Sequence, residues 1–342
     1  MGHVSRMRIQ ILIRGGNELN AIDQASRMLA EALVAEGHDA AVVVWTPGRM
    51  KRDCAGTDLL VLPYNPFMWG RRGFAPRLVR DAFSMRRSHR RPRLALLVHE
   101  PYLPARDPRS LVLSIWQRAQ LGSLLTLADE RFASIEAWAR KLSRLWPTRH
   151  LPSGSNVPDA RNQRAIVRAT LDIDHMFVVA SLSTGHPSHL TSYVKAALTR
   201  MARLDIPLAF LQLGAGAADV RVPDGVRVVR PGAVTAEQLG GLVAAADVLL
   251  TPFIDGVSTR RGSFMAGLCQ EVAVLGTSGE LTDSMLLEEG LELVPVGRPD
   301  QYADRAAALA LDQGALSRSA RSGRQLFERE FTWGTIARRL VG

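Results

Sequence analysis

The strongest candidate for chemistry in this chain is the stretch Asp255–Ala266, with the sequence DGVSTRRGSFMA. An apolar run before it predicts a strand, and the pattern after the acid–glycine turn predicts a helix beginning near Ser258, capped by Ser258 or Thr259. Backbone N–H groups, hydroxyls and the guanidinium groups of Arg260 and Arg261 would then converge on one helix N-terminus. Such a turn is suited to a diphosphate, through the helix dipole and charge-assisted hydrogen bonds. The alternative is an ordinary capped helix with exposed arginines.

A second polar pair, His99 and Glu100, lies at the end of the apolar run Leu94–His99. Ligands of open α/β sheets bind beyond the carboxyl ends of the strands, which is where this pair stands. A histidine there can donate a hydrogen bond to a substrate hydroxyl or stabilise a developing charge. The pattern therefore predicts an active-site loop, and the alternative is a histidine that is hydrogen-bonded within its own loop.

Glycines mark two further turns after predicted strands. Gly15 and Gly16 follow the run Arg8–Ile13 and precede a helical pattern, so their backbone N–H groups can approach an anion such as a phosphate. Gly214 follows the run Leu208–Leu213 and is a weaker signal of a nucleotide-binding loop. Neither turn has the GxGxxG spacing, and the chain contains no Walker A, GxSxG or HExxH motif.

Two histidines, His186 and His189, lie three residues apart on the loop after the first predicted strand of the second half. No acidic or cysteine residue stands at matching spacing, so the pattern predicts an active-site loop without a metal. The two cysteines, Cys54 and Cys269, belong to no CxxC pair, which argues against a disulfide framework and a cysteine-based zinc site. We expect neither a metal nor a cofactor.

The elements that must hold these residues follow one alternating pattern along the chain. Short apolar runs alternate with amphipathic helical stretches, which predicts right-handed βαβ units and mostly parallel sheets. The turn-rich stretch Pro152–Pro158 interrupts the pattern, which then restarts. We therefore predict two α/β domains, 1–152 and 153–325, with ligands bound in the cleft between them. The predicted strands are Arg8–Ile13, Ala40–Trp45, Leu59–Leu62, Leu94–His99, Arg131–Ser134, Met176–Ala180, Leu208–Leu213, Val226–Val229, Val248–Thr251, Val272–Leu275 and Leu291–Val294.

The composition is that of a globular protein. Of the 342 residues, 46% are hydrophobic and 22% are charged, which excludes global disorder. The 43 basic and 33 acidic residues give a formal charge of +10, and nearly all of the basic residues are arginines. No apolar window approaches the ~18 residues of a membrane span, and no segment has the apolar region of a signal peptide. We therefore expect a cytoplasmic protein.

The positive charge is concentrated between Arg71 and Arg93, where nine arginines stand against one acid, Asp81. Apolar residues from Leu78 to Phe83 recur at helical spacing in this run, which predicts a basic amphipathic helix. Such a helix suits an anionic lipid surface, a nucleic acid or an acidic acceptor. The alternative is a solvated helix face.

In their order and spacing, several segments resemble the family 4 retaining glycosyltransferases, which have the GT-B fold. Asp255–Ala266 resembles their donor-binding segment, and His99–Pro101 resembles their fourth-strand histidine. Ile11–Leu33 is similar to their first strand, glycine turn and first helix. Leu151–Pro158 resembles their interdomain strand and linker, and Phe331–Trp333 resembles the start of their closing helix. The resemblance covers nearly the whole chain and implies two Rossmann-like domains whose parallel sheets face an interdomain cleft.

The chain departs from this family at its main signature. The family commonly has two glutamates separated by seven residues, and Asp255 and Ser263 stand at the matching positions here. By resemblance, Asp255 lies near the transferred sugar, and Ser263 offers the nucleotide ribose a shorter, neutral hydrogen bond. The family's basic residues for the diphosphate usually follow the first strand of the second domain, but the matching loop here, Ser183–Ser188, has no cation at its start. Arg260 and Arg261 would then supply this charge.

The resemblance implies transfer of a sugar, with retention of configuration, from a nucleoside diphosphate sugar to a hydroxyl acceptor. The donor base, UDP or GDP, and the acceptor stay open, although the arginine run favours an anionic acceptor on the first domain. His99 would contact the sugar or support an oxocarbenium-like state, Asp255 would bind donor hydroxyls, and Gly214 with Ser263 would contact the nucleotide. The closing segment 326–342 would form a helix, which in this family often crosses back onto the first domain.

Two other functions fit the same sequence. One is a pseudo-glycosyltransferase, or a protein that binds a nucleotide sugar without turnover. The other is a basic protein that binds a membrane or a nucleic acid, supported by the run Arg71–Arg93. The chain has no nucleic-acid module and no basic run interleaved with stacking aromatic residues, so we expect no nucleic acid as a partner. Peripheral membrane contact through the arginine run stays open.

Overall fold

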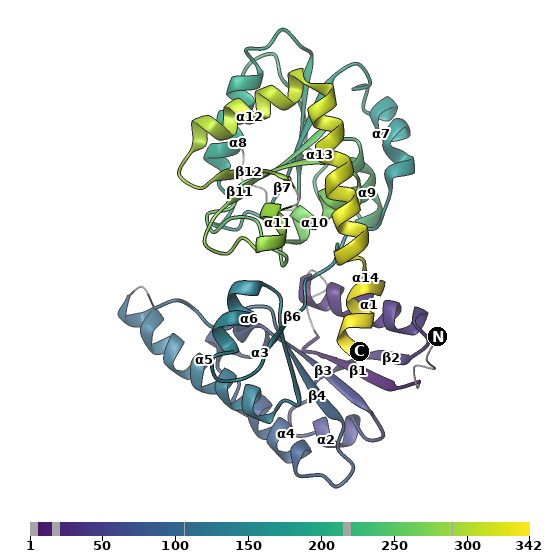
Figure 1. Ribbon diagram of the computed structural model, residues 1–342, viewed down its shortest axis with the longest axis vertical. Coiled ribbons are helices and arrows are strands. Elements are labelled where there is room, and N and C mark those ends of the chain that lie inside the picture. Colours follow the sequence, from purple (N-terminus) through teal and green to yellow (C-terminus); the bar gives the residue numbers. More distant parts are fainter. Residues whose placement is uncertain (1–5, 16–20, 106, 215–219, 289) are drawn as a thin grey trace. The chain divides into compact units, whose positions relative to one another are not determined.

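The computed structural model describes residues 6–15, 21–105, 107–214, 220–288 and 290–342 (Figure 1). The chain divides into two compact units. The N-terminal unit consists of residues 1–153 together with 333–342, and the C-terminal unit consists of residues 154–332. Within the described ranges, no helix is both long enough and apolar enough to span a bilayer.

The N-terminal unit is built on a sheet of six parallel strands in the order β2-β1-β3-β4-β5-β6. All six residues of β3 are buried, because helices cover both faces of a parallel sheet and favour continuous apolar strands. The strands are β1 (Arg8–Ile13), β2 (Asp39–Val44), β3 (Leu59–Tyr64), β4 (Arg93–Val98), β5 (Glu130–Ala133) and β6 (Arg149–His150). The helices are α1 (Ala21–Ala35), α2 (Met50–Asp53), α3 (Pro66–Trp69), the 3-10 turn η1 (Arg71–Gly73), α4 (Pro76–Arg86), α5 (Pro108–Leu127), α6 (Glu136–Leu142) and α14 (Trp333–Val341).

The C-terminal unit repeats this plan with a sheet in the order β12-β11-β10-β7-β8-β9, again parallel throughout. Its strands are β7 (Phe177–Leu182), β8 (Leu208–Leu213), β9 (Arg227–Val229), β10 (Val248–Thr251), β11 (Ala273–Ser278) and β12 (Glu292–Pro295). Its helices are the 3-10 turn η2 (Arg161–Gln163), α7 (Arg164–Thr170), α8 (Thr191–Met201), α9 (Ala236–Ala244), α10 (Gly262–Cys269), α11 (Ser284–Glu288), α12 (Pro299–Leu311) and α13 (Gln313–Leu326). The predicted fold class, two α/β halves with parallel sheets, is confirmed.

The closing segment of the chain returns to the N-terminal unit. The expected helix over 326–342 is in fact two elements, a π-helical turn at Phe327–Phe331 and α14, separated by the extended residue Thr332. The apolar face of α14 joins the buried cluster that contains Leu29 and Leu33 of α1. An ion pair fixes the same contact, since Arg338 donates to Glu36 from 302 residues away, and Figure 1 shows the two helices side by side.

In the core of the C-terminal unit, α10 packs closely against the sheet. A Cβ at Gly267 would overlap the side chains of Val274 in β11 and Leu249 in β10, so only glycine permits this close approach. Phe264 and Met265 of the same helix are fully buried in that core. The first turn of α10 is therefore held rigidly near the carboxyl end of β10, where the predicted site lies.

Candidate functional site

Two loops of the C-terminal unit meet at the carboxyl ends of neighbouring strands. β7 and β10 are paired in parallel, so the loops that follow them leave the same edge of the sheet. Backbone hydrogen bonds join the two loops directly, from Ile254 N–H to the carbonyl of Ser188 (2.9 Å) and from Leu190 N–H to the carbonyl of Pro252 (2.9 Å). The sequence predicted functional residues on both loops, and the structure brings these residues together.

An ion-pair cluster of three residues, Asp255, Arg260 and Arg261, lies at this edge. Arg260 Nη2 donates to one carboxylate oxygen of Asp255 (3.1 Å), and Arg261 Nη2 donates to the other. The second terminal nitrogen of Arg261 donates to Ser188 Oγ (3.1 Å), and its guanidinium lies 4.2 Å from the centre of the Phe253 ring. The side chains of the cluster are 13–21% exposed, so two guanidiniums and one carboxylate leave one net positive charge in a partly desolvated position.

The helix after this cluster begins later than predicted. α10 starts at Gly262, and Arg261 rather than Ser258 or Thr259 is its N-cap, so the predicted capping role of those two hydroxyls is wrong. The physical reason is a competing acceptor, the buried carboxylate of Asp283. Its Oδ2 accepts from Thr259 N–H (2.7 Å) and from Thr259 Oγ1 (2.8 Å), which draws this residue into the protein.

Both hydroxyls are consequently buried. Ser258 and Thr259 have no exposed surface, and within the described part of the chain Ser258 Oγ has no hydrogen-bond partner. The turn that the sequence predicts for a diphosphate therefore offers fewer exposed groups than expected. It consists of Arg260, Arg261 and the first N–H groups of α10, which have no partner within the helix. Ser263 lies in this first turn and is partly exposed.

The second histidine of the predicted active-site loop, His189, is buried and packs against Phe253, the ring that Arg261 also contacts. His189 is 8% exposed, its ring packs edge-on against Phe253 (5.6 Å between centres), and its Nε2 lies 3.5 Å from Ser181 Oγ. Burial, reinforced by the charge of Arg261, lowers the pKa of His189 from 6.5 to about 4. The ring is therefore neutral at pH 7. His186, three residues earlier on the same loop, is exposed, and its Nδ1 lies 2.7 Å from Ser188 Oγ.

The lowered pKa of His189 predicts a loss of stability in mild acid. The unfolded chain takes up the proton near pH 6.5 and the folded chain only near pH 4. This stabilisation is therefore complete above pH 6.5, is lost as the pH falls toward 4, and amounts to about 3 kcal/mol. His189→Asn should remove this part of the pH dependence in urea unfolding, whereas His186→Asn, at an exposed ring, should keep it. Equal curves for the wild type and His189→Asn would contradict the prediction.

Gly214 lies where the sequence placed it, at the end of β8. Its φ is +104°, and a Cβ there would overlap the backbone carbonyl oxygen of Ser183, so only glycine fits. The loop after β7 and the end of β8 are thus packed backbone to backbone. This contact places Gly214 beside the loop that contains His186 and Ser188.

The remaining predicted residues belong to the N-terminal unit. His99 and Glu100 follow β4 and are half-buried. The backbone of both residues donates to the carbonyl of Tyr64, and Glu100 Oε2 accepts from Asn65 Nδ2 (3.0 Å). The two residues therefore lie at the carboxyl end of β4, as predicted, and next to the end of β3. Gly16 lies outside the described residues.

Solved structures with this architecture cover nearly the whole chain. HepE (Alr3699) of Anabaena, in complex with UDP-glucose, has a TM-score of 0.66 and 13% sequence identity over 98% of this chain and 98% of its own. A glycosyltransferase from Rickettsia africae has a TM-score of 0.70 and 10% identity over 98% and 97%. WaaG, a glycosyltransferase involved in lipopolysaccharide biosynthesis, has a TM-score of 0.63 and 11% identity over 97% and 98%.

The chain has the GT-B fold. No family model and no curated protein matches the sequence, so its assignment to family 4 stays a prediction. In the GT-B fold, each parallel sheet with its flanking helices is called a Rossmann-like unit, and this chain has one N-terminal and one C-terminal unit of this kind. Of the residues described, no group of three or more histidine, cysteine or acidic side chains is arranged to hold a metal ion.

Proposed function

We propose that this GT-B protein transfers a glycosyl group from a nucleoside diphosphate sugar to a hydroxyl acceptor, with retention of configuration. The observation that carries the proposal is the cluster of Asp255, Arg260 and Arg261 at the carboxyl end of β10, directly before the N-terminus of α10. Adjacent arginines and free helical N–H groups suit the oxygens of a diphosphate. HepE, which shares the fold, was solved with UDP-glucose, and this supports the same donor class here.

In this proposal the arginines stabilise the leaving group. The bond from the anomeric carbon to the diphosphate oxygen breaks, and negative charge accumulates on that oxygen. Guanidiniums already in place stabilise this charge without reorganisation, so no metal is needed for it. The acceptor oxygen attacks from the same face and passes its proton to the leaving phosphate. By resemblance, His99 contacts the sugar.

Asp255 has a different main role from the one its sequence position implies. Both of its carboxylate oxygens accept from arginines, so the same oxygens are already engaged when a donor arrives. We propose that Asp255 holds Arg260 and Arg261 in extended conformations, which reduces the entropy lost when a diphosphate binds. Contact between Asp255 and donor hydroxyls is a second role in this proposal. Ser263 and Gly214 would contact the nucleotide.

We propose that the acceptor binds to the N-terminal unit. Only some of the arginines in the run Arg71–Arg93 are available to bind it. Of the nine arginines in the run, Arg86 and Arg91 are paired with Asp129, and Arg93 is paired with Glu130. These three are already engaged within the protein. The other arginines of the run are exposed and favour an acceptor, or a surface that carries it, with negative charge.

The test of this function is nucleotide-specific stabilisation followed by transfer. At 100 times the dissociation constant, UDP or GDP should raise the melting temperature by about 5 °C. Tripolyphosphate at equal charge is the control for nonspecific anion binding. Turnover is then measured as nucleotide release from UDP- and GDP-sugars with a panel of hydroxyl acceptors.

Three results would contradict the proposal in different ways. Stabilisation by every polyanion alike, and its loss in salt, would indicate a basic binding protein. Stabilisation by one nucleotide without transfer to any acceptor would indicate a non-catalytic binder. A product of inverted configuration would contradict retention alone.

A further inference from the structure

In the first half of α5, apolar side chains are exposed to solvent and polar side chains are buried. Leu111, Val112 and Ile115 are 50%, 55% and 60% exposed, whereas Ser114 and Gln117 of the same turns are buried. A helix that covers a sheet normally turns its apolar residues inward. Both the buried polar residues and the exposed apolar residues of α5 therefore require an explanation.

The inward side has a structural reason. Gln117 Oε1 accepts from Leu103 N–H (2.8 Å), and its Nε2 donates to the carbonyl of Arg72 (3.3 Å). One turn later, Gln120 Oε1 accepts from Ala75 N–H (2.7 Å), and its Nε2 donates to Tyr64 Oη (3.2 Å). These glutamines fasten the loops on either side of α5. They do not explain why aliphatic side chains face outward.

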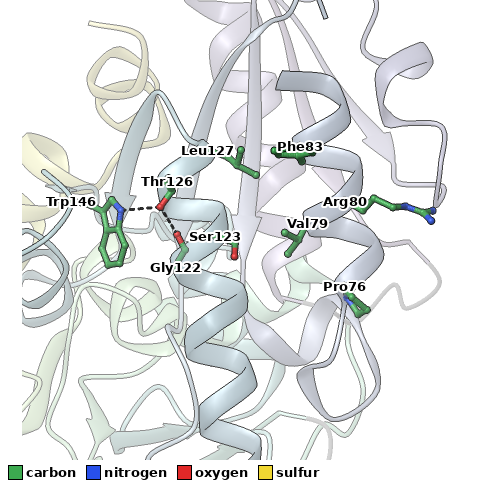
Figure 2. Close-up of a pocket in the computed structure, with 9 residues that line it drawn as sticks. All are labelled: Pro76, Val79, Arg80, Phe83, Gly122, Ser123, Thr126, Leu127 and Trp146. Atoms are coloured by element: carbon green, nitrogen blue, oxygen red, sulfur yellow. Dashed lines mark hydrogen bonds between the residues drawn. The ribbon is translucent and has the colours of Figure 1, made fainter. Parts of the chain in front are cut away.

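The outward stripe continues into a groove. Along α5, Ile115 is followed at helical spacing by the small residues Ala119, Gly122 and Thr126. Gly122 and Thr126 line an open groove of about 670 Å³ against α4. Figure 2 shows Val79 and Phe83 of α4 across from α5, and Trp146 donating to Thr126 Oγ1 (3.2 Å). The groove is lined by Pro76, Val79, Arg80, Phe83, Gly122, Ser123, Thr126, Leu127 and Trp146.

Aromatic side chains extend the same face. Phe74 is 56% exposed and packs edge-on against Trp116 of α5, with 5.6 Å between the ring centres. Phe83 is 45% exposed, and the guanidinium of Arg87 lies 4.2 Å from its ring centre. We call this surface, made by η1, Phe74, α4, the outward side of α5 and Trp146, the α4–α5 face.

The charge of this region is almost entirely positive. Residues 59–128 contain 12 arginines, no lysine and three acids. Asp81 is buried and accepts from Gly48 N–H and Trp45 Nε1, Glu100 accepts from Asn65, and Asp107 caps α5. The exposed arginines among these residues are Arg71, Arg72, Arg77, Arg80, Arg87, Arg90, Arg91, Arg93, Arg109 and Arg118. Of these, Arg91 and Arg93 are paired with Asp129 and Glu130.

We propose that the α4–α5 face docks on an anionic phospholipid bilayer. Aliphatic and aromatic side chains would enter the boundary between headgroups and acyl chains, and the surrounding guanidiniums would pair with lipid phosphates. Binding of a nucleic acid would account for the arginines but not for the exposed aliphatic side chains of Leu111, Val112 and Ile115. A symmetric dimer through this face would oppose one arginine-rich surface with its own copy, which like-charge repulsion disfavours. The bilayer satisfies both the apolar and the charged observations.

Vesicle co-sedimentation of the full chain tests this proposal. We expect at least tenfold stronger partitioning onto vesicles of 70% phosphatidylcholine and 30% phosphatidylglycerol than onto phosphatidylcholine alone. Ile115→Asp should lower this partitioning about tenfold or more. The matched control is Ile166→Asp on α7 of the C-terminal unit, since Ile166 is 68% exposed and should bind as the wild type does.

The contribution of the arginines on the α4–α5 face is tested by a second variant and its matched control. Arg80→Glu should weaken partitioning more than the roughly fivefold expected for removal of one arginine, because it also adds a like charge. Arg321→Glu, at an exposed arginine of α13, should leave partitioning unchanged. Raising NaCl to 0.5 M should weaken the wild type and leave less difference between Arg80→Glu and the wild type.

Each contrary outcome overturns the proposal. The proposal that the face docks on a bilayer would be contradicted by equal partitioning onto neutral and anionic vesicles. It would also be contradicted by equal partitioning of Ile115→Asp and Ile166→Asp. A dimer in sedimentation analysis that Ile115→Asp dissolves would assign the face to a second copy. The vesicles contain no nucleotide sugar, so the result does not depend on whether the protein transfers sugar.

Discussion

Arg261→Ala is expected to lower turnover about 10²–10³-fold while the protein stays folded. Loss of one preorganised donor to a developing oxyanion has an effect of this size in other enzymes. Arg261 is a strong candidate because it also donates to Ser188, lies against Phe253 and immediately precedes the first turn of α10. The measurement is steady-state nucleotide release with donor and acceptor at saturating concentrations.

A conservative variant separates charge from geometry. Arg261→Lys keeps the positive charge but loses the fork of donors that reaches Asp255 and Ser188 together. We expect it to recover part of the stabilisation by nucleotide and little of the turnover. Such a split would show that the directed hydrogen bonds, and not only the net charge, act in the transition state.

The control for this prediction is an arginine of the same unit in an exposed ion pair. Arg227 pairs with Asp172 at 3.1 Å, and their side chains are 42% and 79% exposed. Arg227→Ala should leave turnover within a factor of about two, because exposed ion pairs contribute little. If Arg261→Ala and Arg227→Ala have the same turnover, the diphosphate assignment is wrong.

The fold was predictable because its strands are buried on both faces. Continuous apolar runs such as Leu59–Leu62 stand out in the sequence, and β3 extends this run to Tyr64. The resemblance placed an interdomain strand within Leu151–Pro158, whereas the edge strand β6 covers Arg149 and His150, which carry no apolar signal and pair only at the sheet edge. Helix α5 begins at Pro108, three residues before its apolar residues start at Leu111, because Asp107 accepts from the N–H groups of Arg109 and Ser110.

The sequence placed candidate residues separately on the loops after β7 and β10, and the structure brings these loops together because β7 and β10 are neighbours in one parallel sheet. The local geometry of these loops was less predictable. The start of α10 was wrong, because it depends on Asp283, which lies 24 residues from Thr259 in the sequence. The ion pairing of Asp255 with both arginines was also missed, since spacing alone does not show side-chain direction.

Asp283→Ala is expected to reduce donor affinity as well as stability. This carboxylate is 1% exposed and holds Thr259 through both its N–H and its hydroxyl, directly before the two arginines. Its removal leaves two buried donors of Thr259 without this acceptor, which costs on the order of 3 kcal/mol in the free energy of unfolding. The loop would then no longer fix Arg260 and Arg261, so we expect a rise of tenfold or more in the KM for the donor.

A matched variant separates positioning from stability. Asp81 is also a buried carboxylate that accepts one backbone and one side-chain hydrogen bond, from Gly48 and Trp45, but it lies in the N-terminal unit. Asp81→Ala should cost similar stability and leave the KM for the donor unchanged. Asp283→Asn, which keeps an acceptor oxygen in place, should restore part of the donor affinity. If Asp283→Ala and Asp81→Ala lower stability equally and neither changes that KM, Asp283 supports the fold alone and the two arginines do not depend on it for their position.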